Sequence, residues 1–217
     1  MASLAPLAPM APRRGPARLG LLGGTFDPVH AGHVAAAAGV ARALALDEVL
    51  LVVAARPWQK AERVVAPAEH RLAMAALAAE GVEGLAASDL ELRRPGETYT
   101  VDTLEALAAE DPGRDLFLVV GDDVAGELAT WYRPEAVRRL ATLVVVDRPG
   151  AEPAARDGVV AGLEAGGWQV VRVPVATVDV SSSDVRRRLG EGQPVDGLVP
   201  APVIAYIAEH GLYAGSG

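Results

Sequence analysis

Short apolar runs alternate along this chain with longer stretches in which apolar residues recur at helical spacing. Uninterrupted apolar runs of this length are typical of strands that are buried on both faces. Their alternation with helices predicts an α/β fold, an open parallel sheet with crossover helices on both faces. The predicted strands lie at 18–22, 48–54, 84–88, 115–120, 142–146 and 169–173.

The helical stretches carry start and stop signals of their own. The predicted helices cover 34–46, 67–79, 101–109, 134–140, 182–189 and 200–209. Thr100 is the expected N-cap of the third helix, because its hydroxyl can accept a hydrogen bond from a free backbone N–H. Pro134 suits the first turn of the next helix, and Gly190 suits a helix C-terminus. Scattered Pro, Gly and Asp residues in 147–168 predict a loop with one short helix.

The 217 residues suffice for one sizeable core, and we expect a single domain over residues 17–217. Residues 1–16 are rich in Pro and Ala and have no useful periodicity. We expect them to be a disordered arm, or to precede the true start of the protein. They also lack a charged start followed by an apolar block, which argues against a signal peptide.

The composition excludes several classes of function. A formal net charge of −8 argues against broad nucleic-acid binding and against docking on acidic lipid. The absence of Cys excludes disulfides, thiolate metal sites and a cysteine nucleophile, and it fits a cytoplasmic protein. No apolar run approaches the roughly 20 residues that a membrane helix needs. Lys60 is the only lysine among 20 basic residues, which makes it a candidate for a specific role.

One strand-to-helix turn carries the strongest chemical signal, residues 23–33 with the sequence G-G-T-F-D-P-V-H-A-G-H. The two leading glycines let the backbone bend tightly and let a ligand approach closely. His30 and His33 are three residues apart and share one face at the start of a helix. The free N–H groups and the positive dipole end of that helix, together with two imidazoles, suit an anion such as a phosphate. The turn has no G-x-G-x-x-G motif, and the chain has no Walker A loop.

Further polar residues follow other predicted strands, where an open α/β sheet binds its ligands. Lys60, in a loop after the second strand, is a phosphate ligand or a solvated lysine. Asp123, after the fourth strand, contacts ribose hydroxyls or is an ordinary acidic residue at a helix start. Ser182, Ser183 and Arg186 form a phosphate cradle or belong to a simple helix cap.

Two more segments have both a structural and a functional interpretation. Thr100 lies where the N–H groups of a helix start can hold a carboxylate, although the residues alone favour a simple cap. Trp131 and Tyr132 pack in the core or form a platform on which a flat heteroaromatic ring stacks. All these loops follow predicted strands or close the connection after them, so they can converge on one edge of the sheet.

The turn at 23–33 resembles the H-x-G-H turn of the nucleotidyltransferase superfamily, and more closely the opening motif of bacterial nicotinate-nucleotide adenylyltransferases. The similarity runs from about residue 19 to residue 213. The other matching stretches are R-P-W-Q-K, E-T-Y-T-V-D-T-L, V-V-G-D-D, T-W-Y, D-R-P-G, V-S-S-S-D-V-R and L-V-P-A-P-V-I-A-Y-I-A-E-H-G-L-Y. Many members carry Pro-Pro-His-Lys/Arg where this chain has R-P-W-Q-K, so Lys60 keeps its position in a changed setting.

The resemblance implies a Rossmann-like fold of the nucleotidyltransferase type and a defined reaction. Members transfer the AMP part of ATP to the phosphate of nicotinate mononucleotide, which yields deamido-NAD and pyrophosphate in NAD biosynthesis. Mg²⁺ is expected on the ATP phosphates, with few or no direct protein ligands. ATP and nicotinate mononucleotide are thus the expected partners, with no nucleic acid and no membrane. The oligomeric state stays open, a homo-oligomer included.

The same resemblance implies roles for individual residues. His30, His33, Lys60 and Arg186 are the expected catalytic residues, with His33 nearest the reacting phosphate. The residues implied to bind ATP are Gly24, Thr25, Phe26, His30, Gly32, His33, Asp123, Ser182, Ser183 and Arg186. The residues implied to bind nicotinate mononucleotide are Thr100, through its backbone N–H, Trp131, by stacking on the pyridine ring, Tyr132 and Arg148.

Two other interpretations stay open on the sequence. The acceptor could be pantetheine phosphate or nicotinamide mononucleotide, although Trp131 and the Thr100 region argue against pantetheine, which has no aromatic ring. The chain could also be a non-catalytic nucleotide-binding module, which would bind ATP without turning it over.

Overall fold

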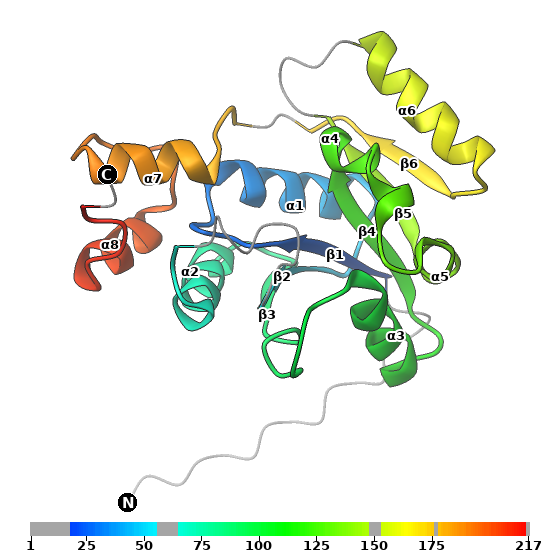
Figure 1. Ribbon diagram of the computed structural model, residues 1–217, viewed down its shortest axis with the longest axis horizontal. Helices are drawn as coiled ribbons and strands as arrows, with labels where there is room; N and C mark the ends of the chain where they lie inside the picture. Colours follow the sequence, from blue (N-terminus) through cyan, green and yellow to red (C-terminus); the bar gives the residue numbers. More distant parts are fainter. Residues whose placement is uncertain (1–17, 56–64, 148–152, 176–177, 216–217) are drawn as a thin grey trace, which may run out of the picture.

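A six-stranded parallel sheet in the order β3-β2-β1-β4-β5-β6 forms the centre of the molecule (Figure 1). The computed structural model describes residues 18–55, 65–147, 153–175 and 178–215. The strands are β1 (Arg18–Gly24), β2 (Glu48–Val53), β3 (Leu85–Ser88), β4 (Asp115–Gly121), β5 (Thr142–Val146) and β6 (Val170–Val173). All six lie where the apolar runs predicted them, so the α/β prediction is confirmed.

Helices fill the connections between strands and the segment after the last strand. They are α1 (Ala31–Ala43), α2 (Ala68–Ala79), α3 (Thr100–Glu110), α4 (Asp122–Ala125), the 3₁₀ helix η2 (Leu128–Thr130), α5 (Pro134–Leu140), α6 (Pro153–Ala165), α7 (Ser182–Gly190) and α8 (Ala201–Glu209). In the described part of the chain, no helix is long and apolar enough to span a membrane.

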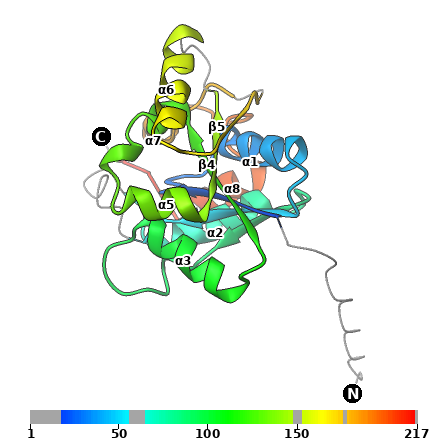
Figure 2. The same ribbon diagram turned by 90° about the vertical axis from the view of Figure 1, so that its right-hand side faces the viewer.

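Alternate strand residues point to opposite faces of the sheet, and this alternation builds two cores. On one face, Leu51 and Val119 pack with the apolar residues of α1, α2, α7 and α8. On the other face, Leu118 and Leu143 pack with those of α3 and α5. Helices therefore cover both faces of the sheet, as the view in Figure 2 shows.

Two predicted helix caps differ from those in the structure. Thr100 is not the N-cap of α3: it is already helical, and the extended residue before it is Tyr99 (φ −117°, ψ 138°). Gly190 is the last residue of α7 rather than its cap, and the left-handed glycine is Gly192 (φ 65°). The chain reverses there because the Gln193 N–H donates to the carbonyl of Arg188 over 2.8 Å.

The segment 147–168 contains more regular structure than its composition predicted. α6 covers 13 residues, whereas Pro, Gly and Asp in this segment indicated a loop with one short helix. Pro153 is the first residue of α6, where its missing N–H costs no hydrogen bond. The predicted breaker therefore acts as a helix start.

The sheet order creates a reversal between β1 and β4. The chain proceeds from β1 towards β2 and β3, and from β4 towards β5 and β6, in opposite directions. The two strands pair in register up to Leu22 and Val119, so the turn after β1 adjoins the end of β4 at Gly121. Open α/β sheets bind ligands at such a reversal, outside the carboxyl ends of the strands.

Candidate active site

The turn between β1 and α1 places the two histidines at the start of a helix. His30 is the N-cap of α1, with an extended backbone (φ −140°, ψ 170°), and His33 is the third helical residue. The backbone N–H of His30 donates to Nδ1 of His33 over 3.2 Å, so an imidazole takes the part that a Glu or Gln plays in a capping box. The two rings are stacked, with centroids 3.6 Å apart and planes inclined by 21°.

This hydrogen bond determines which ring nitrogen of His33 carries a proton. A nitrogen that accepts a hydrogen bond has no hydrogen of its own, so the neutral ring is protonated on Nε2. The ring of Phe26 packs edge-on against His33, with centroids 5.0 Å apart, and limits its rotation. His33 is thus held in the tautomer that can donate from Nε2 to an anionic oxygen.

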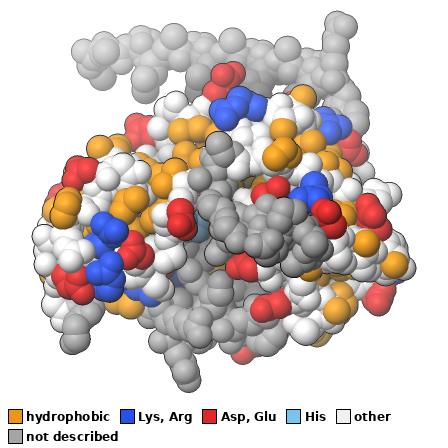
Figure 3. All heavy atoms as spheres, turned by 90° about the horizontal axis from the view of Figure 1, so that it is seen from above, with side chains coloured by type: hydrophobic (Ala, Val, Ile, Leu, Met, Phe, Trp, Pro, Cys, Tyr) orange, Lys and Arg blue, Asp and Glu red, His pale blue; other side chains and the backbone are white. Residues whose placement is uncertain are grey.

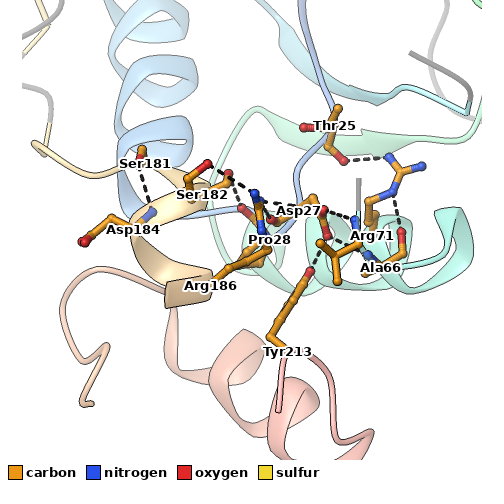
Figure 4. Close-up of polar contacts among 12 residues, drawn as sticks. Thr25, Asp27, Pro28, Ala66, Arg71, Ser181, Ser182, Asp184, Arg186 and Tyr213 are labelled. Atoms are coloured by element: carbon orange, nitrogen blue, oxygen red, sulfur yellow. Dashed lines mark hydrogen bonds and ion pairs between the residues drawn. The ribbon is translucent and has the colours of Figure 1, made fainter. Parts of the chain in front are cut away.

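Asp27 is the polar centre beneath this turn and is only 1% exposed. Its carboxylate accepts hydrogen bonds from the backbone N–H groups of Val65 (2.7 Å) and Ala66 (3.1 Å), and from the hydroxyl of Tyr213 (2.7 Å). Figure 4 shows these groups arriving from segments that are far apart in the sequence. A buried carboxylate is tolerated only when it is paired and hydrogen-bonded, so Asp27 ties these segments to the turn.

The N-terminal end of α7 packs directly on the same turn. Ser182 Oγ donates to the carbonyl of Pro28 over 2.9 Å, and Arg186 Nη1 donates to the carbonyl of Asp27 over 2.6 Å. Arg186 Nη2 also donates to Ser183 Oγ over 3.2 Å. The imidazole pair and the serine–arginine cluster therefore meet at one turn, although 154 residues separate Ser182 from Pro28.

The charge distribution of α7 distinguishes its inner from its outer face. Arg186 turns towards the β1–α1 turn, whereas Arg187 and Arg188 pair with Asp184, and Arg187 also with Glu191. Figure 3 shows basic side chains beside acidic ones on the outside of the molecule near α7. Because α1 and α7 both present their positive dipole ends to the turn, the region is locally electropositive within an acidic chain.

Arg71 braces the ends of β1 and β2 from below, and sequence reasoning did not identify it. It is 1% exposed, and its guanidinium donates to the carbonyls of Thr25 and Ala54 (2.7 Å each) and of Ala66 (3.1 Å). Burial lowers the pKa of Arg71, and the nearby charge of Asp27 opposes that shift. A single buried cation thus connects the β1–α1 turn with both ends of the β2–α2 connection.

Space at the turn is restricted where the glycines stand. A Cβ at Gly24 would lie 3.0 Å from the ring of Phe26, and one at Gly32 would lie 3.1 Å from the carbonyl oxygen of Val178. Phe26 itself has a left-handed backbone (φ 51°), which is costly for a bulky residue. A side chain at Gly24 or Gly32 would therefore force these neighbours to shift by a few tenths of an ångström, whatever ligand the turn contacts.

Thr100, Trp131 and Tyr132 belong to the opposite face of the sheet, which α3 and α5 cover. Trp131 is partly buried against that core, and Tyr132 is 52% exposed. The ring of Tyr132 packs against Tyr99, with centroids 4.6 Å apart. Tyr99 was not among the predicted site residues, and its only signal in the sequence was an aromatic side chain beside Thr100.

Of the three remaining predicted residues, the structure describes Asp123 alone. Asp123 is exposed in α4, directly after β4, and its N–H donates to the side chain of Asp122 over 2.9 Å. Lys60 and Arg148 lie outside the described residues. Within the part of the chain that is described, no three His, Asp or Glu side chains form a group that could hold a metal ion.

Comparison with known proteins adds independent findings. Residues 21–188 match the model of the Cytidylyltransferase-like family. The chain is 41% identical over 206 residues to the probable nicotinate-nucleotide adenylyltransferase of Thermomicrobium roseum, across 90% of this chain and 91% of that protein. It is 43% identical over 196 residues to the protein of the same name from Bordetella petrii, across 90% and 98%.

Among solved structures, the fold is similar to that of the Plasmodium falciparum nicotinic acid mononucleotide adenylyltransferase complexed with NaAD. The TM-score is 0.74, and the match covers 91% of this chain and 97% of the other. At 17% identity, this likeness shows a shared fold.

Proposed function

Because this chain belongs to the family of nicotinate-nucleotide adenylyltransferases, we propose that it transfers the AMP part of ATP to nicotinate mononucleotide. The products are deamido-NAD and pyrophosphate, which makes the reaction a step of NAD biosynthesis. One observation carries the assignment of the site. Ser182 and Arg186 donate to the carbonyls of Pro28 and Asp27, so the starts of α1 and α7 share one turn.

The chemistry requires positioning more than reactive side chains. An oxygen of the mononucleotide phosphate attacks the α-phosphorus of ATP, and the bond from that phosphorus to the bridging oxygen of the β-phosphate breaks. The nucleophile is already an anion, so no side-chain nucleophile is needed. The protein lowers the barrier by aligning the two substrates and by stabilising the charge that develops as pyrophosphate leaves.

The residues of the β1–α1 turn are assigned to the reacting phosphate. His33 would donate from Nε2 to a non-bridging oxygen there, which its hydrogen bond with the His30 N–H supports. His30, stacked on His33, would bind the neighbouring phosphate. Gly24, Thr25, Phe26 and Gly32 would line the nucleotide cleft around them.

The start of α7 is assigned to the leaving group. Ser182, Ser183 and Arg186 would hold the β- and γ-phosphates through hydroxyls, backbone N–H groups and a guanidinium. This role is supported by the orientation of Arg186, which donates inward to the turn while Arg187 and Arg188 pair on the outside. Lys60 would add positive charge near the same phosphates.

The second substrate is assigned to the start of α3 and the residues after η2. Trp131 would stack on the pyridine ring, with Tyr132 supporting it, and the backbone N–H of Thr100 would bind the nicotinate carboxylate. Arg148 would add charge for that carboxylate. This role is supported by the position of the partly buried Trp131 next to the exposed Tyr132 in the chain. Together they offer an apolar surface on which a flat ring can stack.

Several further features are proposed with the same reaction. Mg²⁺ would arrive on the ATP phosphates and neutralise the departing pyrophosphate, without a dedicated set of protein ligands. Asp123 would contact a ribose hydroxyl. The single domain over residues 17–217 and the cytoplasmic location stay predictions.

A pyrophosphate-release assay tests the proposal. The protein is mixed with Mg-ATP and one acceptor at a time, namely nicotinate mononucleotide, nicotinamide mononucleotide or pantetheine phosphate. We expect the highest kcat/KM with nicotinate mononucleotide. Faster release with either of the other acceptors would reassign the substrate. ATP binding without pyrophosphate release from any acceptor would indicate a non-catalytic module.

A further inference from the structure

The C-terminal end of the described chain reaches into the site. Tyr213 follows α8, is 4% exposed, and its hydroxyl donates to Oδ1 of Asp27 over 2.7 Å across 186 residues of sequence. Its backbone is left-handed (φ 64°), which a tyrosine rarely adopts. A strained residue that is buried on an active-site turn is placed by its surroundings for a specific contact.

The hydroxyl of Tyr213 occupies an acceptor position that a bidentate pair between Arg186 and the Asp27 carboxylate would need. Oδ1 of Asp27 already accepts from Ala66 and Tyr213, and Oδ2 accepts from Val65. Arg186 Nη1 stays 3.8 Å from Oδ2, too far for a hydrogen bond, and donates instead to the Asp27 carbonyl, while Nη2 donates to Ser183 Oγ. The guanidinium therefore stays beside the serines and does not form a bidentate pair with the carboxylate.

We propose that Tyr213 is a positioning residue that keeps the guanidinium of Arg186 available to the phosphates of ATP. Without the hydroxyl, each oxygen of this buried carboxylate accepts only one hydrogen bond, and among the described residues Arg186 is the cation within 4 Å of it. A bidentate pair between an arginine and a carboxylate is among the stronger polar contacts in proteins. Arg186 would then turn towards Asp27 and away from Ser183.

The other charged group at Asp27 does not compete for this position. Arg71 also lies near the carboxylate, but its N–H groups are engaged by the carbonyls of Thr25, Ala54 and Ala66. Burial and the Asp27 carboxylate raise the pKa of Tyr213, so its hydroxyl remains a donor throughout the working pH range.

The inference rests on the proposed function, and Tyr213→Phe tests it because this change removes the hydroxyl and keeps the ring. We expect the KM for ATP to rise about tenfold, the equivalent of one charge-assisted hydrogen bond, while the KM for nicotinate mononucleotide stays within about twofold. Tyr206→Phe is the matched control. It removes a hydroxyl from α8 that contacts His70 over 2.9 Å, away from Asp27, and both KM values should be unchanged.

A double-mutant cycle shows whether Tyr213 acts through Arg186. The affinity for a non-hydrolysable ATP analogue is measured for wild type, Y213F, R186A and the double variant, below the melting temperature of each. We expect Y213F to weaken binding in the wild type and to have no further effect beside R186A. An equal loss in both backgrounds, or a lower melting temperature with unchanged affinity and KM values, would overturn the proposal. Because this cycle measures binding, it remains decisive even if the wild type releases no pyrophosphate.

Discussion

The two halves of the candidate site are built in different ways. The half around the β1–α1 turn is braced by buried charges, because Asp27 and Arg71 are each 1% exposed and both bind the surrounding backbone. In the half around Trp131, the indole packs partly against the core, Tyr132 packs on Tyr99, and Arg133 forms an exposed ion pair with Glu105 over 2.9 Å. One half is therefore rigid in its polar contacts, and the other presents an accessible aromatic surface.

This difference corresponds to the chemistry proposed for each half. Stabilising a charge that develops during a reaction requires donors that are already in position, since their reorganisation would add to the barrier. Binding a flat ring requires only an apolar surface of suitable size, and small movements there change affinity rather than rate. Mutations in the first half should therefore reduce turnover or stability strongly, and mutations in the second should mainly change the KM of one substrate.

The largest effect is expected at His33. His33→Ala removes the proposed Nε2 donor, and kcat/KM for pyrophosphate release should fall by about 10²–10³-fold, as for other pre-positioned donors. The melting temperature should fall by only a few degrees, because the lost capping contact with His30 is worth about 1 kcal/mol.

His33→Asn separates these two effects. The amide oxygen can replace Nδ1 as the acceptor for the His30 N–H, whereas nothing replaces Nε2. This variant should be about as stable as the wild type and as inactive as His33→Ala. If it retains full activity, the imidazole is structural and the proposed role is wrong.

The second largest effect is on stability. Arg71→Met keeps much of the side-chain length but leaves the buried carbonyls of Thr25, Ala54 and Ala66 without their donors. We expect a loss of about 3–5 kcal/mol in the free energy of unfolding, measured by urea denaturation. Arg133→Met, in the exposed pair with Glu105, should lower the free energy of unfolding much less, because solvent screens an exposed ion pair. Equal losses would show that the two halves do not differ in rigidity.

A smaller and more selective effect is expected at Trp131. Trp131→Ala removes the proposed stacking surface, so the KM for nicotinate mononucleotide should rise about tenfold or more, with the KM for ATP changed little. Trp131→Phe keeps an aromatic face, so its KM for nicotinate mononucleotide should lie between those of the wild type and Trp131→Ala. A parallel rise in both KM values would mean that Trp131 supports the core and does not contact the substrate.

The smallest effect concerns pH. Glu91 is buried in the loop before α3, where it accepts a hydrogen bond from Thr103 over 2.9 Å, and burial raises its pKa. The folded protein thus binds this proton more tightly than the unfolded chain does. The resulting stability is present in full below the ordinary pKa of a glutamate and is lost as the pH rises through the raised value.

Glu91→Gln should flatten this dependence, because the amide is neutral at every pH. Urea denaturation of both proteins between about pH 4 and about pH 8 measures the difference, and the free energy of unfolding of the wild type should fall relative to that of Glu91→Gln as the pH rises. Parallel curves for the two proteins would show that Glu91 titrates as it does in the unfolded chain.

The elements of the fold could be predicted because their signals are local. The apolar runs identified all six strands, and the His30–His33 spacing indicated two imidazoles at a helix start. Predictions failed where the local signal was ambiguous. A hydroxyl beside a helix start suggested Thr100 as the N-cap, but the chain becomes helical one residue earlier, after the extended Tyr99.

The buried charges could not be predicted in this way. Asp27, followed by Pro28, indicated only a turn, and Arg71 stands in a helix in which an arginine is ordinarily a surface residue. Nothing in the sequence around Tyr213 predicted a contact with the turn after the first strand. Each of these residues depends on partners between 38 and 186 positions away, or on carbonyls of distant loops.

The amino-acid sequence by itself determined the succession of strands and helices, because hydrophobic periodicity depends on neighbours within a few residues. It also determined which loops carry polar chemistry, since these follow the strands. Only the tertiary structure decided that the start of α7 joins the turn after β1, and that a C-terminal hydroxyl completes the contacts of Asp27. Such contacts depend on how distant segments of the chain pack together at the sheet. A local sequence pattern carries no information about that packing.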